Sequence, residues 1–434
     1  MKIKISEESK VSYIFLLKWV LLSLTAGILG SVTVQSFFFF LTAISDFLLK
    51  YPVPPPVYAV FGAIITGGIV YRLQPEASGE GIPSYIQGLK VYGGKLPSSV
   101  TIFKYIAGLV TLSTFGNGGL VGPVGRVTAG IMSFISSRLH KLGLTDDDIH
   151  TATICGMAAT VGAIFHTSIG GGIFAVEIIQ REKMGYKDLF PAILSSSTAV
   201  FIAKLFGLRS VYLIQAPQEL MDARMIGWLV VLSVLLGFAG KLYTRLYGLI
   251  TKLIKREKGN VLLKVIAGSA VASCIAWFIN PELLGTSGRL IQSIIGAEIP
   301  LLAGRLNGTI SIGWILIVMM ICKALCNCIT VGSGMSAGFT GPAAIIGMLL
   351  GSSVAFFLNI DQSSPSYYAF IAAGFSGMLA SSTNIPLASA VMTIEIFGLE
   401  YSIPAAVAAV IGFQINRHVA IYDFARAGAG TISD

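Results

Sequence analysis

The chain has 434 residues, of which 54% are hydrophobic and 12% are charged, and its formal net charge is +9. Soluble domains carry about 25% charged residues. The low charged share and a mean hydropathy of +0.79 exclude an ordinary soluble domain and indicate that lipid is the main solvent. The positive charges stand between apolar runs, which favours cytoplasmic loops near lipid head groups over a nucleic-acid partner.

The first apolar stretch, Val11 to Leu49, is too long for the core of a signal peptide. It predicts a long or tilted membrane helix that follows a cytoplasmic N-terminal tail at residues 1–10. A helix needs about 20 apolar residues to cross a bilayer. Runs that meet this length are Tyr13–Phe40, Met225–Leu246, Val261–Ile279 and Ile312–Ile329.

Other apolar segments are shorter and interrupted by glycine. They are Ala59–Val70, Ile102–Leu112, Thr153–Ile164 and Ala369–Leu379. We expect helices of this kind to enter the membrane and stop partway, which is tolerated only where protein or water covers the loose backbone. The pattern is typical of channels and transporters that bind their substrate near the membrane midplane.

The chain also repeats a glycine pattern. The segment 116–126, GNGGLVGPVGR, can be laid over 332–342, GSGMSAGFTGP, so that four glycines coincide without a gap. Further along, IFAVEI at 173–178 resembles VMTIEI at 391–396. Two matches in the same order predict an internal duplication, with membrane repeats at 11–215 and 216–423 and a C-terminal tail at 424–434. A basic stretch at 241–258 lies between two helices of the second repeat.

Each glycine segment follows an apolar helix and leads into another, expected at Arg126–Leu139 and Pro342–Leu358. Unpaired N–H groups at such a helix start, together with the helix dipole, make an anion site. Fixed dipoles also bind an anion weakly enough to release it again, which conduction requires. A third segment, Ser78–Tyr85, leads into a helix at Pro83, because proline suits the first helical turn. The alternative is that the glycines serve helix packing alone.

In this order and spacing the three segments resemble the pore signatures of the CLC family of chloride channels and anion/proton exchangers. The family patterns run G-S-G-I-P, G-R/K-E-G-P and G-x-F-x-P, and we match them with residues 79–83, 122–126 and 338–342. A family pore tyrosine near the end of the last membrane helix is matched by Tyr422, and Lys323 and Glu395 also resemble family positions. The pore residues that the resemblance implies are Gly79, Glu80, Gly81, Ile82, Gly122, Pro123, Val124, Gly125, Gly338, Phe339, Thr340 and Tyr422.

The resemblance implies an all-α polytopic membrane protein, built from two inverted repeats of tilted and broken helices. It implies a homodimer with one pore per subunit. Chloride or another small anion would be the transported ion and membrane lipid the surroundings, without a cofactor or a metal ion. We expect a prokaryotic plasma membrane and a cytoplasmic N-terminus.

The departures from the family patterns bear most on mechanism. The glutamate of the second signature is the family's external gate and proton carrier, and we match its position with Val124. The exchangers' internal proton-transfer glutamate is matched with Ile178, one residue after Glu177. Neither side chain can carry a proton, which favours passive conduction over proton-coupled exchange. In the third signature Thr340 replaces phenylalanine.

Glu80 replaces the serine that caps the central anion in the family. An ionised carboxylate inside an anion site would repel the anion, and an ionisable residue within a membrane is a functional candidate. Several arrangements stay open at this point. The carboxyl group is neutral and donates a hydrogen bond, or swings away, or acts as a relocated gate or proton carrier. Alternatively, its side chain points elsewhere and only the backbone faces the pore.

Other polar residues in apolar segments have simpler interpretations. Glu177 and Glu395 occupy matched places, where acids more often cap or brace helices than take part in transport. Lys104 and Lys323 either draw anions towards the pore or extend to a membrane interface. His166 is interpreted as a loop residue. The five cysteines are interpreted as small buried hydrophobes.

The leading hypothesis is a passive anion channel. The alternatives within transport are an exchanger that uses Glu80 as a proton carrier and a relative that prefers fluoride or nitrate. An intramembrane enzyme that uses Glu177, Glu395 or His166 is the alternative from another class. No pair of these residues has convincing catalytic spacing, so we expect the protein not to be an enzyme.

Overall fold

The computed structural model describes residues 7–179, 185–208, 210–212, 214–256, 260–306, 308 and 310–424, with side chains from residue 17 onward except that of 142. Most of the two predicted tails and the end of the basic stretch at 257–258 lie outside the described residues. Within them the chain is helical, with no strand and one isolated β-bridge between Gly119 and Gly338. The expected all-α architecture is confirmed.

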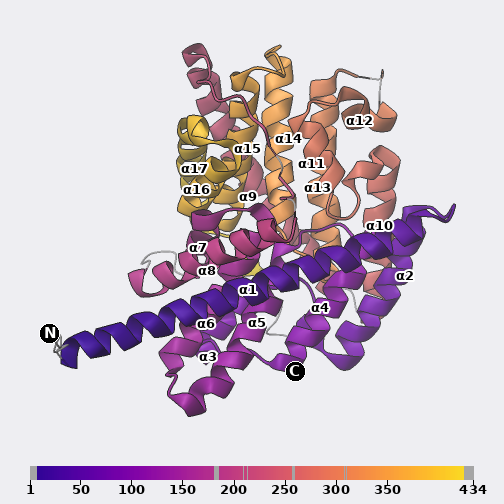
Figure 1. The fold of residues 1–434 in the computed structure, drawn as a ribbon. Coiled ribbons are helices and arrows are strands. Elements are labelled where there is room, and N and C mark those ends of the chain that lie inside the picture. Colours follow the sequence, from indigo (N-terminus) through magenta and orange to yellow (C-terminus); the bar gives the residue numbers. More distant parts are fainter. Residues whose placement is uncertain are drawn as a thin grey trace.

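The described part of the chain contains seventeen α-helices, joined by loops and short 3₁₀ or π segments (Figure 1). Those before the predicted boundary between the repeats are α1 (Glu7–Leu49), α2 (Pro55–Gly68), α3 (Ile82–Tyr92), α4 (Ser98–Ser113), α5 (Val121–Leu139), α6 (Asp146–Phe165), α7 (Ser168–Glu177) and α8 (Tyr186–Leu205). Those after it are α9 (Ile226–Arg256), α10 (Val261–Ile279), α11 (Gly288–Ile295), α12 (Ile299–Ala303), α13 (Ile312–Gly332), α14 (Thr340–Phe357), α15 (Pro365–Thr383), α16 (Pro386–Phe397) and α17 (Ser402–Asn416).

Eight helices in the described part of the chain are long and apolar enough to cross a membrane. The expectation of partial helices was wrong for two segments, because α2 continues through a π-turn to Leu73 and α6 runs for 20 residues. Helix α6 extends beyond its apolar run because the Thr145 side chain caps the polar first turn that begins at Asp146. Helices α4, α7 and α16 remain short, with 10–17 residues each.

Helix α1 has 43 residues and is therefore about 65 Å long at 1.5 Å per residue. A hydrocarbon core of about 30 Å accommodates such a helix only if it is strongly tilted. In Figure 1 it runs obliquely across one face of the molecule. It packs against α8 and α6 through glycines, since a Cβ atom on Gly27 would lie 2.5 Å from Thr198 Cβ, and one on Gly30 would lie 2.4 Å from Ala159 Cβ.

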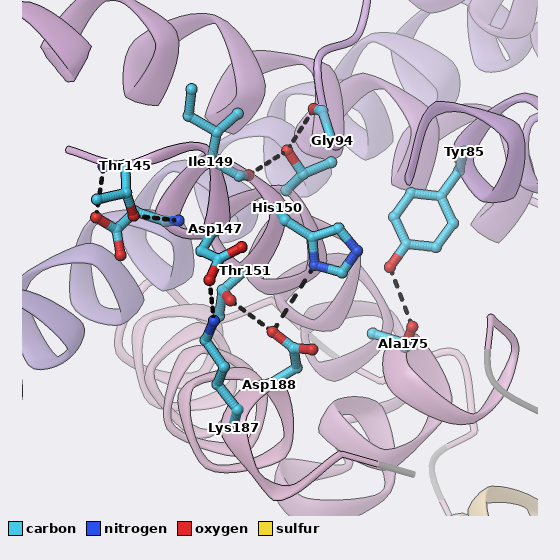
Figure 2. A network of polar contacts seen from close by, with 12 residues as sticks. Tyr85, Gly94, Thr145, Asp147, Ile149, His150, Thr151, Ala175, Lys187 and Asp188 are labelled. Carbon is cyan, nitrogen blue, oxygen red and sulfur yellow. Dashed lines mark hydrogen bonds and ion pairs between the residues drawn. The ribbon is translucent and has the colours of Figure 1, made fainter. Parts of the chain in front are cut away.

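A polar network joins the start of α6 to the start of α8 (Figure 2). Lys187 Nζ forms an ion pair with Asp147 Oδ2 at 2.6 Å, and Thr151 Oγ1 donates to Asp188 Oδ1 at 2.5 Å. His150 Nδ1 lies 3.8 Å from the same Asp188 oxygen. These contacts fix one end of α6, whose span is otherwise almost entirely buried.

The two halves are related at a backbone contact. Gly119 N–H donates to Gly338 O at 2.9 Å, and Gly338 N–H donates to Gly119 O at 2.8 Å. The sequence separation of this pair equals that between the first residues of α5 and α14, Val121 and Thr340. Residues that pair with their own counterparts lie on a pseudo-twofold axis, so this contact marks the axis between the repeats.

The glycine alignment made from sequence is therefore wrong by three residues. In the structural register Gly119-Leu-Val-Gly-Pro matches Gly338-Phe-Thr-Gly-Pro, and both prolines are the third residue of their helix. Glycines are so frequent here that several registers give coincidences, whereas a proline within a first helical turn marks one position. The exact boundary between the repeats, in the segment that joins α8 to α9, stays a prediction.

Glu177 and Glu395 cap each other's helices across this axis. Glu177 accepts from Leu387 N–H at 3.0 Å and Ala388 N–H at 2.7 Å, at the start of α16. Glu395 accepts from Ile169 N–H at 2.9 Å and Gly170 N–H at 2.7 Å, at the start of α7. Each carboxylate satisfies two amides of a helix that is too short to span the membrane. The geometry matches the bracing role interpreted from the sequence.

We expect Glu177→Gln to lower the stability of the fold, because the amide replaces one of two charge-assisted acceptors. The loss corresponds to about 1–2 kcal/mol of unfolding free energy, measured as a lower midpoint of thermal unfolding in detergent. Glu395→Gln should behave alike, and Glu219→Gln, at an exposed acid, should leave the midpoint unchanged. A midpoint equal to that of the wild type would contradict the bracing role.

Candidate functional site

The starts of α3, α5 and α14 converge at the centre of the molecule. Helix α5 begins at Val121 rather than at Arg126, and α14 begins at Thr340 rather than at Pro342. The residues expected in the second and third loops therefore lie largely within first helical turns. Because Pro123 and Pro342 occupy positions whose N–H groups have no partner inside the helix, proline does not interrupt either helix there.

Glycine permits this convergence at a few defined points. A Cβ atom on Gly81 would lie 2.0 Å from the carbonyl oxygen of Gly122, so the start of α3 can approach α5 this closely only at glycine. Gly79, just before it, has a φ of +59°, a conformation that also favours glycine. Gly125 is different, because it faces Met157 on α6 and serves packing.

Glu80 carries its carboxylate into the space between these helix starts. Its Oε2 accepts from the N–H of Ile82 at 2.5 Å. A Cβ atom on Gly122 would lie 2.1 Å from Oε1, and one on Gly338 would lie 3.4 Å from it. The side chain is 6% exposed, and Oε1 has no hydrogen-bond partner. The carboxylate thus lies against all three helix starts, which excludes the arrangement in which it points elsewhere.

Hydroxyl groups surround the same region. The Tyr422 and Thr340 hydroxyls form a hydrogen bond with each other at 3.1 Å, and Tyr422 is 1% exposed. Tyr243 donates its hydroxyl to Asn327 Oδ1, and Asn327 Nδ2 in turn donates to Gly338 O at 3.2 Å. The Phe339 ring packs edge-on against Tyr243 and Tyr247. Side chains from the second half therefore hold the α14 loop rigidly beside Glu80.

Two buried lysines shape the loops on either side. Lys104, 1% exposed, donates from Nζ to the carbonyl oxygens of Ala77, Ser78 and Gly79 at 3.1, 3.1 and 2.6 Å. Lys323, 0% exposed, donates to the oxygens of a counterpart loop, Leu283 O, Gly285 O and Ser287 Oγ, at 3.0, 3.3 and 2.6 Å.

The interpretation of these lysines as groups that extend to a membrane interface is therefore wrong. The sequence separation of Lys104 and Lys323 equals that of Gly119 and Gly338. Each lysine neutralises a group of carbonyl dipoles inside the protein. Lys104 also interacts electrostatically with Glu80, so it attracts the negative charge at the site while it holds the loop that carries Glu80.

A cavity of ≈ 710 Å³ leads from the surface to this site. Glu80 and Gly79 line its inner end. Lys255 at the end of α9 and Glu76 are exposed residues on its wall, so the cavity opens to solvent where α9 ends and α10 begins. An anion in water can therefore reach Glu80 from this side.

The remaining predicted residues lie outside the region where the starts of α3, α5 and α14 meet. Val124 is buried one turn into α5, and Ile178 is buried at the end of α7. His166 ends α6 with a φ of +58° and is a loop residue, as expected. Four cysteines are buried, whereas Cys274 is exposed, which corrects its interpretation as a core residue. Among the described residues no cluster of His, Cys, Asp or Glu could hold a metal ion.

Sequence reasoning missed the roles of three polar side chains in this region. Asn327 and Tyr243 lie in long apolar helices, and only their isolated polarity in such a run marks them. Arg126 was read as the end of a signature, but it is a buried cation on the wall of the cavity. A polar or charged residue is costly to bury. Its presence in an apolar segment was therefore the sequence feature that could have marked all three.

Comparison with known proteins connects this geometry to a family. Residues 61–417 match the family model described as voltage gated chloride channel. An uncharacterized protein of Methanocaldococcus jannaschii is 27% identical over 423 residues, covering 95% of this chain and 97% of the relative. A protein of Pseudomonas syringae pv. tomato named a chloride/fluoride channel protein is 23% identical over 290 residues, 67% of this chain and 61% of the relative.

Solved structures share the fold at low identity. A CLC-type fluoride/proton antiporter superposes with a TM-score of 0.78 at 20% identity, over 95% of this chain and 98% of its own. A slow cyanobacterial Cl⁻/H⁺ antiporter gives 0.77 at 18% identity, over 96% and 98%. A eukaryotic CLC transporter gives 0.73 at 17% identity, over 96% and 74%. With the family model matching most of the sequence, this chain belongs to the voltage-gated chloride channel (CLC) family, whose members are anion channels and transporters.

Proposed function

We propose that this protein conducts small anions, chloride first among them, passively along a pathway through the starts of α3, α5 and α14. The observation that carries the proposal is the Glu80 carboxylate, a negative group held by a backbone N–H where three helix dipoles point. A place that binds a tethered carboxylate with backbone groups is suited to bind a free anion in the same way. The names of the relatives, which include chloride and fluoride channels or antiporters, support anions as the substrate class.

Passive conduction is supported by the absence of acids at the two proton-carrier positions. In the structural register the pattern G-R/K-E-G-P corresponds to Gly119–Pro123, and the glutamate position becomes Val121 instead of Val124. Both are valines that are 1% exposed, so the correction leaves the argument intact. At the other position, Ile178 is equally unable to carry a proton.

In this proposal Glu80 is the gate. Its carboxylate and a transported anion cannot occupy the same place, since the carboxylate already fills the space in front of Gly122 and Gly338, where an added Cβ atom would lie 2.1 and 3.4 Å from Oε1. An anion passes when Glu80 leaves the site, and protonation helps it leave by removing the charge that the helix starts attract. The hydrogen-bonded pair of Tyr422 and Thr340 hydroxyls then keeps one O–H that can donate to the passing ion.

A second candidate is proton-coupled exchange with Glu80 as the carrier. The observation in its favour is that Glu80 lines the cavity, so water can deliver a proton to it from that side. Chloride-preferring and fluoride- or nitrate-preferring transport are both compatible with a threonine and a tyrosine at the site.

We also propose a homodimer in a membrane, with the cavity on the cytoplasmic side. Helices α7 and α16 are too short to span, yet they expose Ile169 and Leu387 at 48% each. A second copy that packs on these apolar side chains would cover both short helices and keep the Glu177 and Glu395 caps away from lipid. The basic second half of α9 beside the cavity supports a cytoplasmic orientation under the positive-inside rule.

Anion efflux from liposomes that contain the purified protein, with internal pH recorded at the same time, tests the transport mode. We expect chloride to leave without net proton movement when a chloride gradient is imposed. A chloride gradient that drives protons against their own gradient would refute passive conduction and support exchange through Glu80. Empty liposomes give the background leak.

Replacement of Glu80 tests the gate. Glu80→Ser should raise chloride flux at neutral pH by roughly tenfold or more, which corresponds to about 1.4 kcal/mol, because it removes a carboxylate that competes with the anion for the site. The wild-type flux should rise as pH falls, and the variant should lose this dependence. Glu80→Gln should resemble the protonated wild type.

Glu76→Gln is the matched control for this series, since Glu76 is an exposed carboxylate on the wall of the same cavity. It should keep the wild-type pH dependence. An unchanged flux in Glu80→Ser across the pH series would rule out Glu80 as the gate.

A further inference from the structure

Arg126 is a buried cation that the transport argument does not use. It lies in the second turn of α5 and is 1% exposed. Its Nη1 donates to Thr101 Oγ1 at 3.2 Å, while its Nε is buried without a hydrogen-bond partner. No salt bridge in the described part of the chain includes it. Burial of a cation without a carboxylate partner is costly, which indicates that an anion from solution neutralises the guanidinium.

The unpaired edge of the guanidinium defines the chemistry of that partner. Nη1 is directed to Thr101, which leaves the Nε–H and Nη2–H groups of the other edge. These two groups lie parallel in a fixed fork and match two oxygens of a planar oxyanion. A spherical halide can contact the same edge, but it cannot use the fork as fully.

The surroundings of Arg126 are accessible and favour negative charge. Arg126 lines the ≈ 710 Å³ cavity, together with Lys255 and Lys264. Helix α4 starts on the same wall after Pro97, which provides no side-chain cap for its N–H groups. The opposing charges are the carboxylates of Glu76, which interacts with Arg126 electrostatically, and Glu80.

We propose that the Arg126 guanidinium forms a second anion-binding site in the cavity, on the solvent side of Glu80, that prefers small planar oxyanions of the nitrate or carboxylate type over halides. The site deepens the proposed function, on which its role in transport rests. Arg126 Cβ lies beside Gly81, the residue after Glu80. An anion held by Arg126 therefore waits next to the gate without competing with the Glu80 carboxylate.

Anion binding to the purified protein in detergent tests the site without any transport. Titration of the wild type with nitrate and with chloride, followed by calorimetry, should show nitrate binding more tightly. Arg126→Gln should weaken nitrate binding by roughly tenfold or more, because it removes two charge-assisted hydrogen bonds. Equal nitrate affinity in wild type and Arg126→Gln would overturn the proposal.

Arg126→Lys provides an independent test of the site if the glutamine variant does not fold. Lysine keeps the charge and loses the fork, so the ratio of nitrate to chloride affinity should fall towards one. An unchanged ratio would overturn the proposal. Lys252→Gln is the matched control, because it removes an exposed charge of α9 that does not line the cavity, and it should leave the ratio as in the wild type.

The outcome separates this inference from the proposed function. Glu80→Ser should change flux and keep the nitrate preference in the binding titration, whereas Arg126→Gln should lose the preference whether or not flux persists. A protein that shows no anion flux but retains Arg126-dependent nitrate binding would refute conduction and keep the site. Anion flux together with equal nitrate binding in the wild type and the Arg126 variants would support conduction and refute the second site.

Discussion

The architecture depends on two backbone hydrogen bonds between Gly119 and Gly338. They join the loops before α5 and α14 at the pseudo-twofold axis and bring two helix starts together in the interior. Like ends of helix dipoles repel each other, so this arrangement is unfavourable unless a negative charge lies between them. The Glu80 carboxyl group lies between them and accepts a hydrogen bond from the N–H of Ile82 at a third helix start, so it supplies that charge when it is ionised. The fold and the preference for anions therefore have one physical origin.

The convergence is held by polar contacts that compensate for its electrostatic cost. Lys104 and Lys323 each gather loop oxygens, and Glu177 and Glu395 each cap a short helix of the other half. Broken helices inside a membrane leave unsatisfied amides and carbonyls. These four charged side chains satisfy them in symmetric pairs, which explains why a chain with few charges carries buried ones at matched positions.

Much of this arrangement was predictable from sequence, in particular the membrane class, the duplication, the three glycine segments and the family. The register of the duplication could not be predicted from coincident glycines, because they are uninformative in a glycine-rich chain. The matched prolines and lysines carry the register instead. The direction of the Glu80 side chain also required coordinates, since it depends on the contact of Gly122 with Gly338. Arg126 was hidden for a similar reason, because a family pattern assigned it to a motif before its burial was known.

The charges near the pathway show why one carboxylate does not complete the site. Lys104 interacts with Glu80, and Arg126 adds a second buried cation that interacts unfavourably with Lys104. Glu76 also faces Arg126, but it is exposed and water screens its charge. Among the buried groups, two cations therefore stand against the single carboxylate of Glu80 when Glu80 is ionised. An anion that displaces Glu80 only exchanges one negative charge for another, whereas an anion that binds beside Arg126 removes the excess. In a low-dielectric interior the second event gains more electrostatic energy per ion, so we expect an anion to bind beside Arg126 first and the proposed gate to respond to an anion that is already present.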